Sequence, residues 1–431
     1  MIRFCMTLLV ILFATRIMAS EPLRLNLEQA LLMASQQNPH VLIAKTRVQG
    51  AIARIGQARS AVMPQINGLV NGSRQVRDLR SGGFSLPGAG PSVGPFNSFD
   101  SRVRLSVDLF NPSTVKRLQA SIKSKEATVA EMDKTKEDIL ALVANMYLDA
   151  KRARQHLNAV ERVYQREKQA FDKAQRQFDQ GIINDVELLQ AKASFEETRF
   201  LVSQAQVDEK EQRLNLLQAL GVDGDVPIFF KKDAAIKNVE QDIVAPNVRL
   251  AIANVNEAQA QVSAAKAGLL PQIEGVADIG YAGKDFNNSS RVYTVGLQAI
   301  IPFWQGGLTQ AQIQEAKSHQ EGMTIALDDA KRQSHNDKDI AQGTINQAKG
   351  LMRYRYVQLL AANKMLATSE RRFNEGLIEE VGFKEALAIQ VLAKDDYQDA
   401  LAFYQMAQIK RAHSQGKMET LFHGAKPTAT K

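Results

Sequence analysis

The longest helical run in this chain constrains its fold more than any other feature. After Pro112 no Gly or Pro occurs until Gly181, so residues 113–180 form one almost unbroken helical pattern. At 1.5 Å per residue, a helix over this segment is roughly 100 Å long. Such a length is far beyond that of a globular helix, and the run therefore predicts coiled-coil packing against other helices.

Apolar residues within this run follow a heptad rhythm. Their spacing alternates between four and three residues and favours left-handed supercoiling of packed helices. Glu167 is the one polar position in the series. The seam consists of Met146, Ala150, Ala153, Leu157, Val160, Tyr164, Phe171, Ala174 and Phe178. Further helical patterns cover residues 26–60 and 185–219.

The second part of the chain repeats the first. Met63-Pro64-Gln65-Ile66-Asn67-Gly68 recurs 207 positions later as Leu270-Pro271-Gln272-Ile273-Glu274-Gly275. Phe178-Asp179-Gln180-Gly181-Ile182-Ile183 recurs 195 positions later as Phe373-Asn374-Glu375-Gly376-Leu377-Ile378. The heptad seam, shifted by the same 195 positions, recurs with polar exceptions at Arg355 and Ser369.

A period this long exceeds that of solenoid repeats and indicates a duplicated half. We divide the chain accordingly. Residues 1–20 are a leader, 21–220 the first repeat, 221–246 a connector with an equatorial position, 247–415 the second repeat, and 416–431 a flexible C-terminal tail.

Short strand-like runs lie between the helices of each half. In the first half Val103, Leu105, Val107 and Leu109 alternate with polar residues, and in the second half Tyr293, Val295, Leu297 and Ala299 do so. Residues 66–72 and 273–281 are weaker candidates. This alternation fits strands that face lipid on one side and water on the other, and ordinary half-buried strands are the alternative. A long Gly- and Pro-rich loop is expected at 73–100, and a shorter one at 283–290.

The first twenty residues have the features of a secretory signal peptide: Arg3, a short apolar run and small residues at Ala19 and Ser20. A buried N-terminal helix is the alternative. The single cysteine, Cys5, lies in this leader, so disulfide and thiolate chemistry are not expected in the rest of the chain. No later run of eighteen apolar residues occurs, so any membrane insertion has to use strands.

Charge and motifs indicate neither nucleic-acid binding nor an enzyme. The formal net charge of +8 falls to +6 without Arg3 and Arg16, and the basic residues alternate with acidic ones along helical stretches. The pattern is typical of a solvated helix face. The six histidines are scattered without a His-Glu-x-x-His pair, and a solvent-facing role is expected for each. No catalytic residue, metal site or cofactor is predicted.

Four strands are too few to close a membrane barrel, and an open sheet edge in lipid leaves backbone groups unsatisfied. If the strands lie in a membrane, the chain must oligomerise, and three copies would supply twelve strands. The long helices would then continue the barrel as a helical tube.

The chain resembles the TolC family of outer-membrane efflux proteins. The resemblance covers residues 24 to about 415. It rests on the duplicated Pro-Gln-Ile-x-Gly strand entry, the strand ends at Leu109-Phe110-Asn111 and Pro302-Phe303-Trp304, and the turns at Gly181 and Gly376. It implies a mainly α fold with membrane β-strands: a homotrimer with a twelve-stranded β-barrel, four strands per chain, continued by a long α-helical coiled-coil barrel.

The same resemblance implies a transport role and partners. The chain would be the outer-membrane channel of a tripartite efflux or type I secretion system that extends into the periplasm. It would work with a periplasmic adaptor (membrane fusion) protein and an inner-membrane pump or ABC transporter. The alternatives are a periplasmic adaptor and a structural coiled-coil protein of the cell envelope. The duplication opposes an adaptor, which usually has a single helical hairpin flanked by compact β domains, and a structural coiled-coil protein would not need the strand pair in each half.

The resemblance places the two Gly turns at the closed periplasmic tip. The expected tip residues are Gly181, Ile182, Gly376 and Leu377, and nearby acids could form a cation-attracting constriction in a trimer. Carboxylates at a helix start also interact favourably with the helix dipole, and a purely structural role of this kind is the alternative to a constriction. Gly382 stands where the family often has an acid, which argues against a two-layer acidic ring. The aperture candidates are Asp185, Glu187, Glu379, Glu380 and Glu385.

Overall fold

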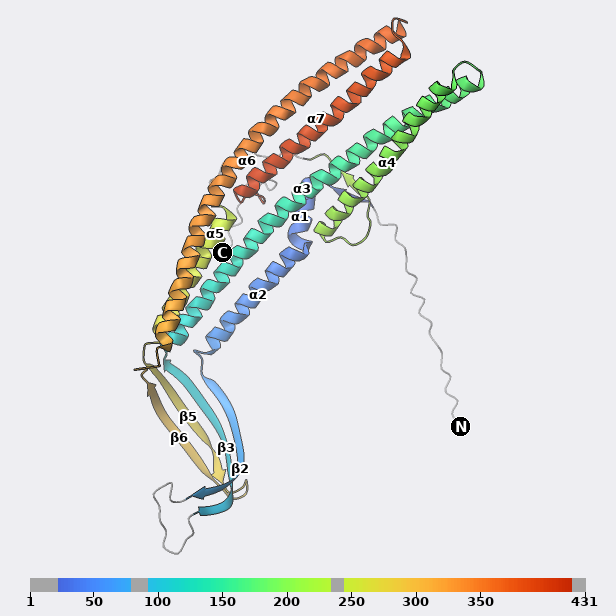
Figure 1. The fold of residues 1–431 in the computed structure, drawn as a ribbon. Coiled ribbons are helices and arrows are strands. Elements are labelled where there is room, and N and C mark those ends of the chain that lie inside the picture. The colour runs from blue at the N-terminus through green and yellow to red at the C-terminus, as the bar shows by residue number, and fades with distance from the viewer. Residues whose placement is uncertain (1–21, 79–91, 234–243, 421–431) are drawn as a thin grey trace, which may run out of the picture.

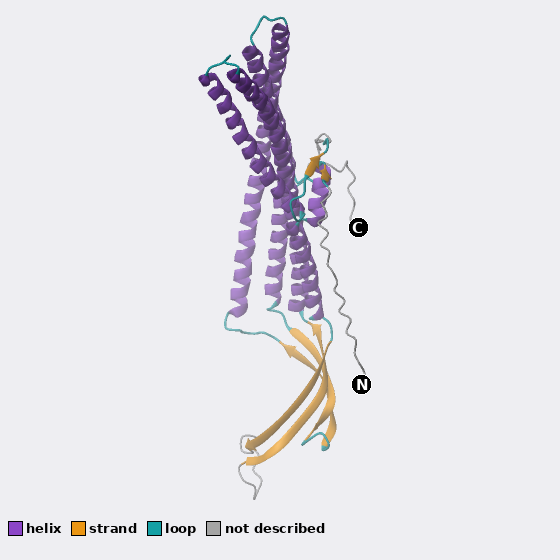
Figure 2. Cartoon of the chain, turned by 90° about the vertical axis from the view of Figure 1, so that its right-hand side faces the viewer, coloured by secondary structure: helices purple, strands orange, loops and turns teal. Residues whose placement is uncertain are grey.

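The computed structural model describes residues 22–78, 92–233 and 244–420, and the expected leader at 1–20 lies outside them. The protein is elongated, with long helices in one part and a curved four-stranded sheet in the other (Figures 1 and 2). The longest helix, α3 (Pro112–Asp179), has 68 residues and its counterpart α6 (Leu308–Asn374) has 67, as the sequence predicted. The other helices are α1 (Leu27–Gln37), α2 (Pro39–Ser60), α4 (Asp185–Leu220), α5 (Pro246–Ala267) and α7 (Glu380–Ser414).

The helices pack side by side into one curved layer, which we call the helical wall. Near the sheet, contacts follow the order α2, α3, α5, α6, and towards the hairpin ends they follow the order α4, α3, α7, α6. The predicted seams form the packed faces. Ala150, Ala153 and Leu157 are buried in α3, and Ala341, Ile345 and Ala348 are buried in α6.

The predicted helix over residues 26–60 is two helices, because Asn38 and Pro39 interrupt it. Asn38 ends α1 and caps α2: its side-chain oxygen accepts hydrogen bonds from the backbone N–H groups of His40 (2.9 Å) and Val41 (3.4 Å). Pro39 then occupies the first turn of α2, where the missing N–H has no cost. The capped α2 and the Pro-initiated α5 both have 22 residues, and Pro39 and Pro246 are 207 positions apart, so the duplication includes this helix.

The sheet is fully antiparallel, with strand order β2–β3–β5–β6. Its strands are β2 (Gln65–Asp78), β3 (Ser92–Phe110), β5 (Gln272–Gly283) and β6 (Ser289–Ile300). Much of the expected loop at 73–100 is therefore strand, with Ser73 paired to Ser98 and Gln75 to Phe96. These pairs lack apolar alternation, so no sequence pattern predicted a strand there. The core of that loop, residues 79–91, lies outside the described part of the chain.

The two faces of this sheet differ in polarity. Residues directly opposite each other in the ladder share a face, and the row Ile66, Leu105, Ala277 and Val295 runs across all four strands. Its neighbours on the same face include Val103, Ile279, Tyr293 and Leu297, all of them exposed. Val295 is 79% exposed, the highest value among them. We call this the apolar face. The opposite, polar face carries Asn67, Arg102, Arg104, Asp278, Thr294 and Gln298.

A compact core lies midway along the helical wall. Strand β1 (Leu23–Leu25) pairs in parallel with β4 (Ile228–Phe230) from the connector. This pair, α1, the end of α4 and the end of α7 pack on the middle of α3, around the fully buried Tyr147. Met418 is also buried in this core, so residues 416–420 pack here, four residues beyond the expected start of the tail. Residues 421–431 are outside the described chain.

Candidate functional site

The two helix turns at the far end of the wall have the same geometry. Gly181 and Gly376 both have φ of +72°, in the left-handed region that glycine adopts without strain. The Gly181 N–H donates to the Phe178 carbonyl (2.8 Å), and the Ile182 N–H donates to the Gln177 carbonyl (2.9 Å). The second turn repeats this pattern with bonds of 3.0 and 2.8 Å. Both are Schellman turns, so the predicted glycine role is confirmed.

We expect Gly181→Val to destabilise the first turn by about 1–3 kcal/mol, because a β-branched residue is strained at positive φ. Gly181→Asn is the matched control, because Asn tolerates this conformation better. Hydrogen exchange at the backbone amides of residues 176–190 measures the change. Equal exchange in the Val and Asn variants would show that φ does not matter here.

The aperture candidates of the first turn lie at the start of α4. Asp185 is its first residue, and Asn184 is the N-cap residue: its side-chain oxygen accepts a hydrogen bond from the Glu187 N–H (2.9 Å), and its side-chain nitrogen donates one to the Glu187 carboxylate (3.1 Å). Both carboxylates are exposed. Glu187 therefore has a structural role at the helix start, whereas Asp185 has its carboxylate free for solvent-facing interactions.

The candidates of the second turn lie at the start of α7. Glu379 is the N-cap residue but makes no side-chain capping bond, and both Glu379 and Glu385 are exposed. Glu380 begins the helix, and its side chain is outside what the structure describes. The two turns are the ends of separate hairpins (Figure 1), so one copy of the chain does not gather all five acids into one cluster.

Large apolar side chains accompany these acids. Ile182 is 64% exposed and Leu377 is 62% exposed. Val186 and Val381, the second residues of α4 and α7, are exposed as well. Paired apolar and acidic residues at both turns form a surface suited to contact with another protein or another copy of the chain.

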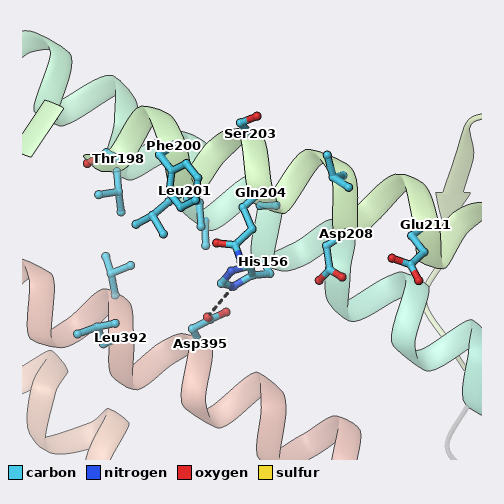
Figure 3. Close-up of a pocket in the computed structure, with 16 residues that line it drawn as sticks. His156, Thr198, Phe200, Leu201, Ser203, Gln204, Asp208, Glu211, Leu392 and Asp395 are labelled. Atoms are coloured by element: carbon cyan, nitrogen blue, oxygen red, sulfur yellow. Dashed lines mark hydrogen bonds and ion pairs between the residues drawn. The ribbon is translucent and has the colours of Figure 1, made fainter. Parts of the chain in front are cut away.

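Ion pairs that no sequence pattern indicated join the two halves. Arg152 on α3 donates two hydrogen bonds to Asp399 on α7 (2.6 and 2.7 Å), and His156 lies 3.2 Å from Asp395. The histidine borders a groove of about 800 Å³ between α3, α4 and α7 (Figure 3), which is lined by Leu201, Leu392 and the acid Asp208, among others. His156 is half-exposed, which agrees with the expected solvent-facing role, and it is also paired with Asp395.

A second unpredicted cluster surrounds Asp233 in the mid-wall core. Its carboxylate accepts hydrogen bonds from the Tyr147 hydroxyl (2.8 Å), the Lys151 ammonium (2.6 Å) and the Leu27 N–H (2.9 Å). The side chain of Asp233 is only 7% exposed. Burial, and then this hydrogen bond, raise the pKa of Tyr147. Asp233 thus joins the connector to α1 and α3.

The end of α7 is attached to α3 by a third cluster. The buried Glu137 carboxylate accepts a hydrogen bond from the Met418 N–H (2.9 Å), and His413 lies 2.7 Å from Asp138. Burial alone would raise the pKa of Asp138, but hydrogen bonds from His413 and Lys134 lower it overall. Burial raises the pKa of Glu137 above its usual value of 4.5.

We expect Glu137→Gln to stabilise the C-terminal segment at neutral pH. Because the folded-state pKa of Glu137 is raised, wild-type stability falls as pH rises from about 4.5 through that value. The Gln variant removes this loss, so its thermal midpoint should exceed that of the wild type at pH 7 and match it near pH 4. A lower midpoint for the variant at pH 7 would contradict the prediction. Glu131→Gln, on an exposed position of the same helix, is the control.

The described residues, 22–78, 92–233 and 244–420, contain neither a membrane-spanning helix nor a metal site. None of the described helices combines the length and the hydropathy needed to cross a membrane. Within the same ranges, no group of three or more His, Cys, Asp or Glu side chains is arranged to hold a metal ion.

Known proteins match the chain in sequence and in fold. It is 24% identical over 328 residues to protein CyaE of Bordetella pertussis, which covers 71% of this chain and 66% of that protein. It is 21% identical over 379 residues to outer membrane protein TolC of Vibrio cholerae, which covers 81% of each. The fold matches the crystal structure of the CmeC outer membrane channel of Campylobacter jejuni with a TM-score of 0.76 at 15% identity, over 91% of this chain and 85% of that one.

A match to a protein-family model shows the family of this chain. The model described as outer membrane efflux protein matches residues 30–222 and 243–411, which together make up most of the chain and include both helix turns and all four strands of the sheet. The family consists of transport channels of the outer membrane, not enzymes. This chain belongs to the outer membrane efflux protein family.

Proposed function

We propose that three copies of this chain form an outer-membrane channel that exports substrates from the periplasm or cytoplasm. The channel would be the outer component of a tripartite efflux or type I secretion system. Twelve strands would close into a barrel, and the helical walls would continue it as a tunnel through the periplasm.

The main support for this proposal is the sheet, which is apolar on one face and has unpaired strands at both edges. The exposed row from Ile66 to Val295 is unsuited to water, and β2 and β6 each have one side without a strand partner in the described chain. In lipid those unpaired backbone groups are costly, so the edges must be covered. Pairing β2 of one copy with β6 of the next covers every edge once the ring closes.

The helical wall supports the same ring. Its outer helices are α2 and α4 on the β2 side and α6 on the β6 side. Both sides carry exposed apolar residues, among them Ile43 and Phe200 on one and Ile340 and Val357 on the other. Strands and helices of neighbouring copies would therefore meet along the same two edges.

The tips are the proposed aperture and partner surface. In a trimer Asp185, Glu187, Glu379, Glu380 and Glu385 each occur three times around the axis, and rings of carboxylates attract cations. The exposed Ile182 and Leu377 supply apolar contacts for neighbouring hairpins, for a periplasmic adaptor, or for the inner-membrane pump or ABC transporter with which it works.

We expect replacement of Glu379, Glu380 and Glu385 with Ala to lower the cation selectivity or change the conductance of single channels in planar bilayers. Nine carboxylates would be removed from one trimer, and their field acts on ions within about one Debye length of 10 Å. Replacement of three exposed acids far from the turns (Asp328, Asp329 and Asp337 on α6) is the control. Unchanged selectivity and conductance would show that the second turn is not part of the aperture.

Membrane fractionation tests the proposed function. The channel should be recovered in the outer membrane as a heat-modifiable oligomer of about three chains. A soluble periplasmic monomer would contradict the proposal and favour an adaptor or a structural coiled-coil protein. Co-purification after cross-linking in cells would then identify the pump class.

A further inference from the structure

The polar face of the sheet carries a charge cluster across the seam between the two repeats. Strand β3 is the last strand of the first repeat and β5 the first of the second, and they pair with Arg104 directly opposite Asp278. Arg102 lies two residues away on the same face. The halves of the duplicated chain are therefore joined by charged side chains at this level of the sheet.

Asp278 is buried in this cluster, whereas Arg104 is partly exposed. Arg102 donates to Asp278 (3.1 Å) and to Asp100 (2.7 Å), while an Arg104 nitrogen lies 3.8 Å from the second Asp278 oxygen. The Asp278 side chain is only 4% exposed, whereas that of Arg104 is 45% exposed. Both guanidinium groups therefore pair with a carboxylate that is almost completely buried.

The charges of this group balance. Two arginines face two aspartates, and the structure places two further carboxylates on the same face: Asp108 and Glu274, opposite each other near the helices. Asp108 accepts a hydrogen bond from the Asn111 side chain (2.8 Å) beside the start of α3. The arginines thus offset part of an otherwise acidic surface.

We propose that Arg104 and Asp278 are specificity-determining residues that set the charge of the channel at the level of the strands. The inference rests on the proposed function, because it requires the polar face to line the channel. In the trimer three such clusters form a belt separate from the acids at the helix tips. The belt offsets part of the negative charge of this segment and thereby limits the preference of the channel for cations.

Two substitutions that remove charges of opposite sign test the proposed belt. Arg104→Gln leaves each cluster with one net negative charge and should raise the cation-to-anion permeability ratio at least about twofold, the effect of three unit charges at ~10 Å in 0.1 M salt. Asp278→Asn should lower that ratio. The double variant restores the charge balance and should return the ratio towards the wild-type value. Reversal potentials of single channels under a KCl gradient measure all three.

Arg291→Gln is the matched control. It removes the same charge from the same sheet, but Arg291 lies opposite Tyr281 on the apolar face, outside the channel. The proposal is overturned if Arg104→Gln and Asp278→Asn channels keep the wild-type ratio, or if Arg291→Gln produces the same shift as Arg104→Gln. If Asp278→Asn does not assemble, the permeability ratio of Arg104→Gln channels is compared with that of the charge-preserving Arg104→Lys channels. Equal ratios in these two variants would overturn the proposal. Wild-type protein that forms no channels would instead refute the proposed function.

Discussion

Val295→Arg should abolish assembly in the outer membrane. Val295 is 79% exposed and lies in the apolar row of the sheet, where lipid is the expected environment. An arginine at mid-depth on the lipid face costs about 2–4 kcal/mol in each copy. Three copies carry that cost together, so the oligomer should fall below detection by heat-modifiability on gels.

Thr294→Arg is the neighbouring control on the other face. Thr294 pairs with Asp278 in the ladder, so the new guanidinium faces water and a carboxylate. This variant should assemble close to the wild-type level. Equal assembly of both variants, or equal failure of both, would show that the two faces of the sheet are not in different environments.

Asp233→Ala should produce the largest loss of stability in the helical part of the chain. It removes the partner of the Tyr147 hydroxyl, the Lys151 ammonium and the Leu27 N–H at once. Leaving such groups buried without partners costs about 3 kcal/mol or more. The urea midpoint of the purified protein should fall markedly, and the connector should become sensitive to protease.

Asp223→Ala is the control, because it removes an exposed carboxylate from the same connector. Asp233→Asn should give an intermediate result, since its amide oxygen still accepts a hydrogen bond while the ion pair with Lys151 is lost. A midpoint for Asp233→Ala equal to that of Asp223→Ala would show that the Asp233 cluster is not what holds the mid-wall core.

Features that depend on local sequence could be predicted in detail. The expected helix at 113–180 differs from α3 by one residue at each end, because an absence of Gly and Pro and a sustained heptad are properties of the segment itself. The turns at Gly181 and Gly376 were found through their repetition. The break at Asn38 was missed, although Asn followed by Pro is a recognisable helix start.

Features that depend on distant partners were missed. Asp233 lies in a polar connector without periodicity, and its three partners come from α1 and α3. The Arg152–Asp399 pair joins residues 247 positions apart, so no sequence pattern marks it. The pairing of β3 with β5 follows from how the halves meet, and so the cluster of Arg104 and Asp278 could not be read from either strand alone.

The central claim is that neighbouring copies meet along β2 and β6, and disulfide cross-linking in the native membrane tests it most directly. The only native cysteine, Cys5, lies in the expected leader, so background is low. A Cβ atom added at Gly296 on β6 would meet no other atom, so Gly296→Cys is the fixed member of each pair. It is combined in turn with a cysteine on the same face of β2: Leu69→Cys, Asn71→Cys or Ser73→Cys. We predict that at least one pair gives a covalent trimer as the largest species after oxidation. Monomers alone across the panel, or a ladder that continues beyond three chains, would contradict the account.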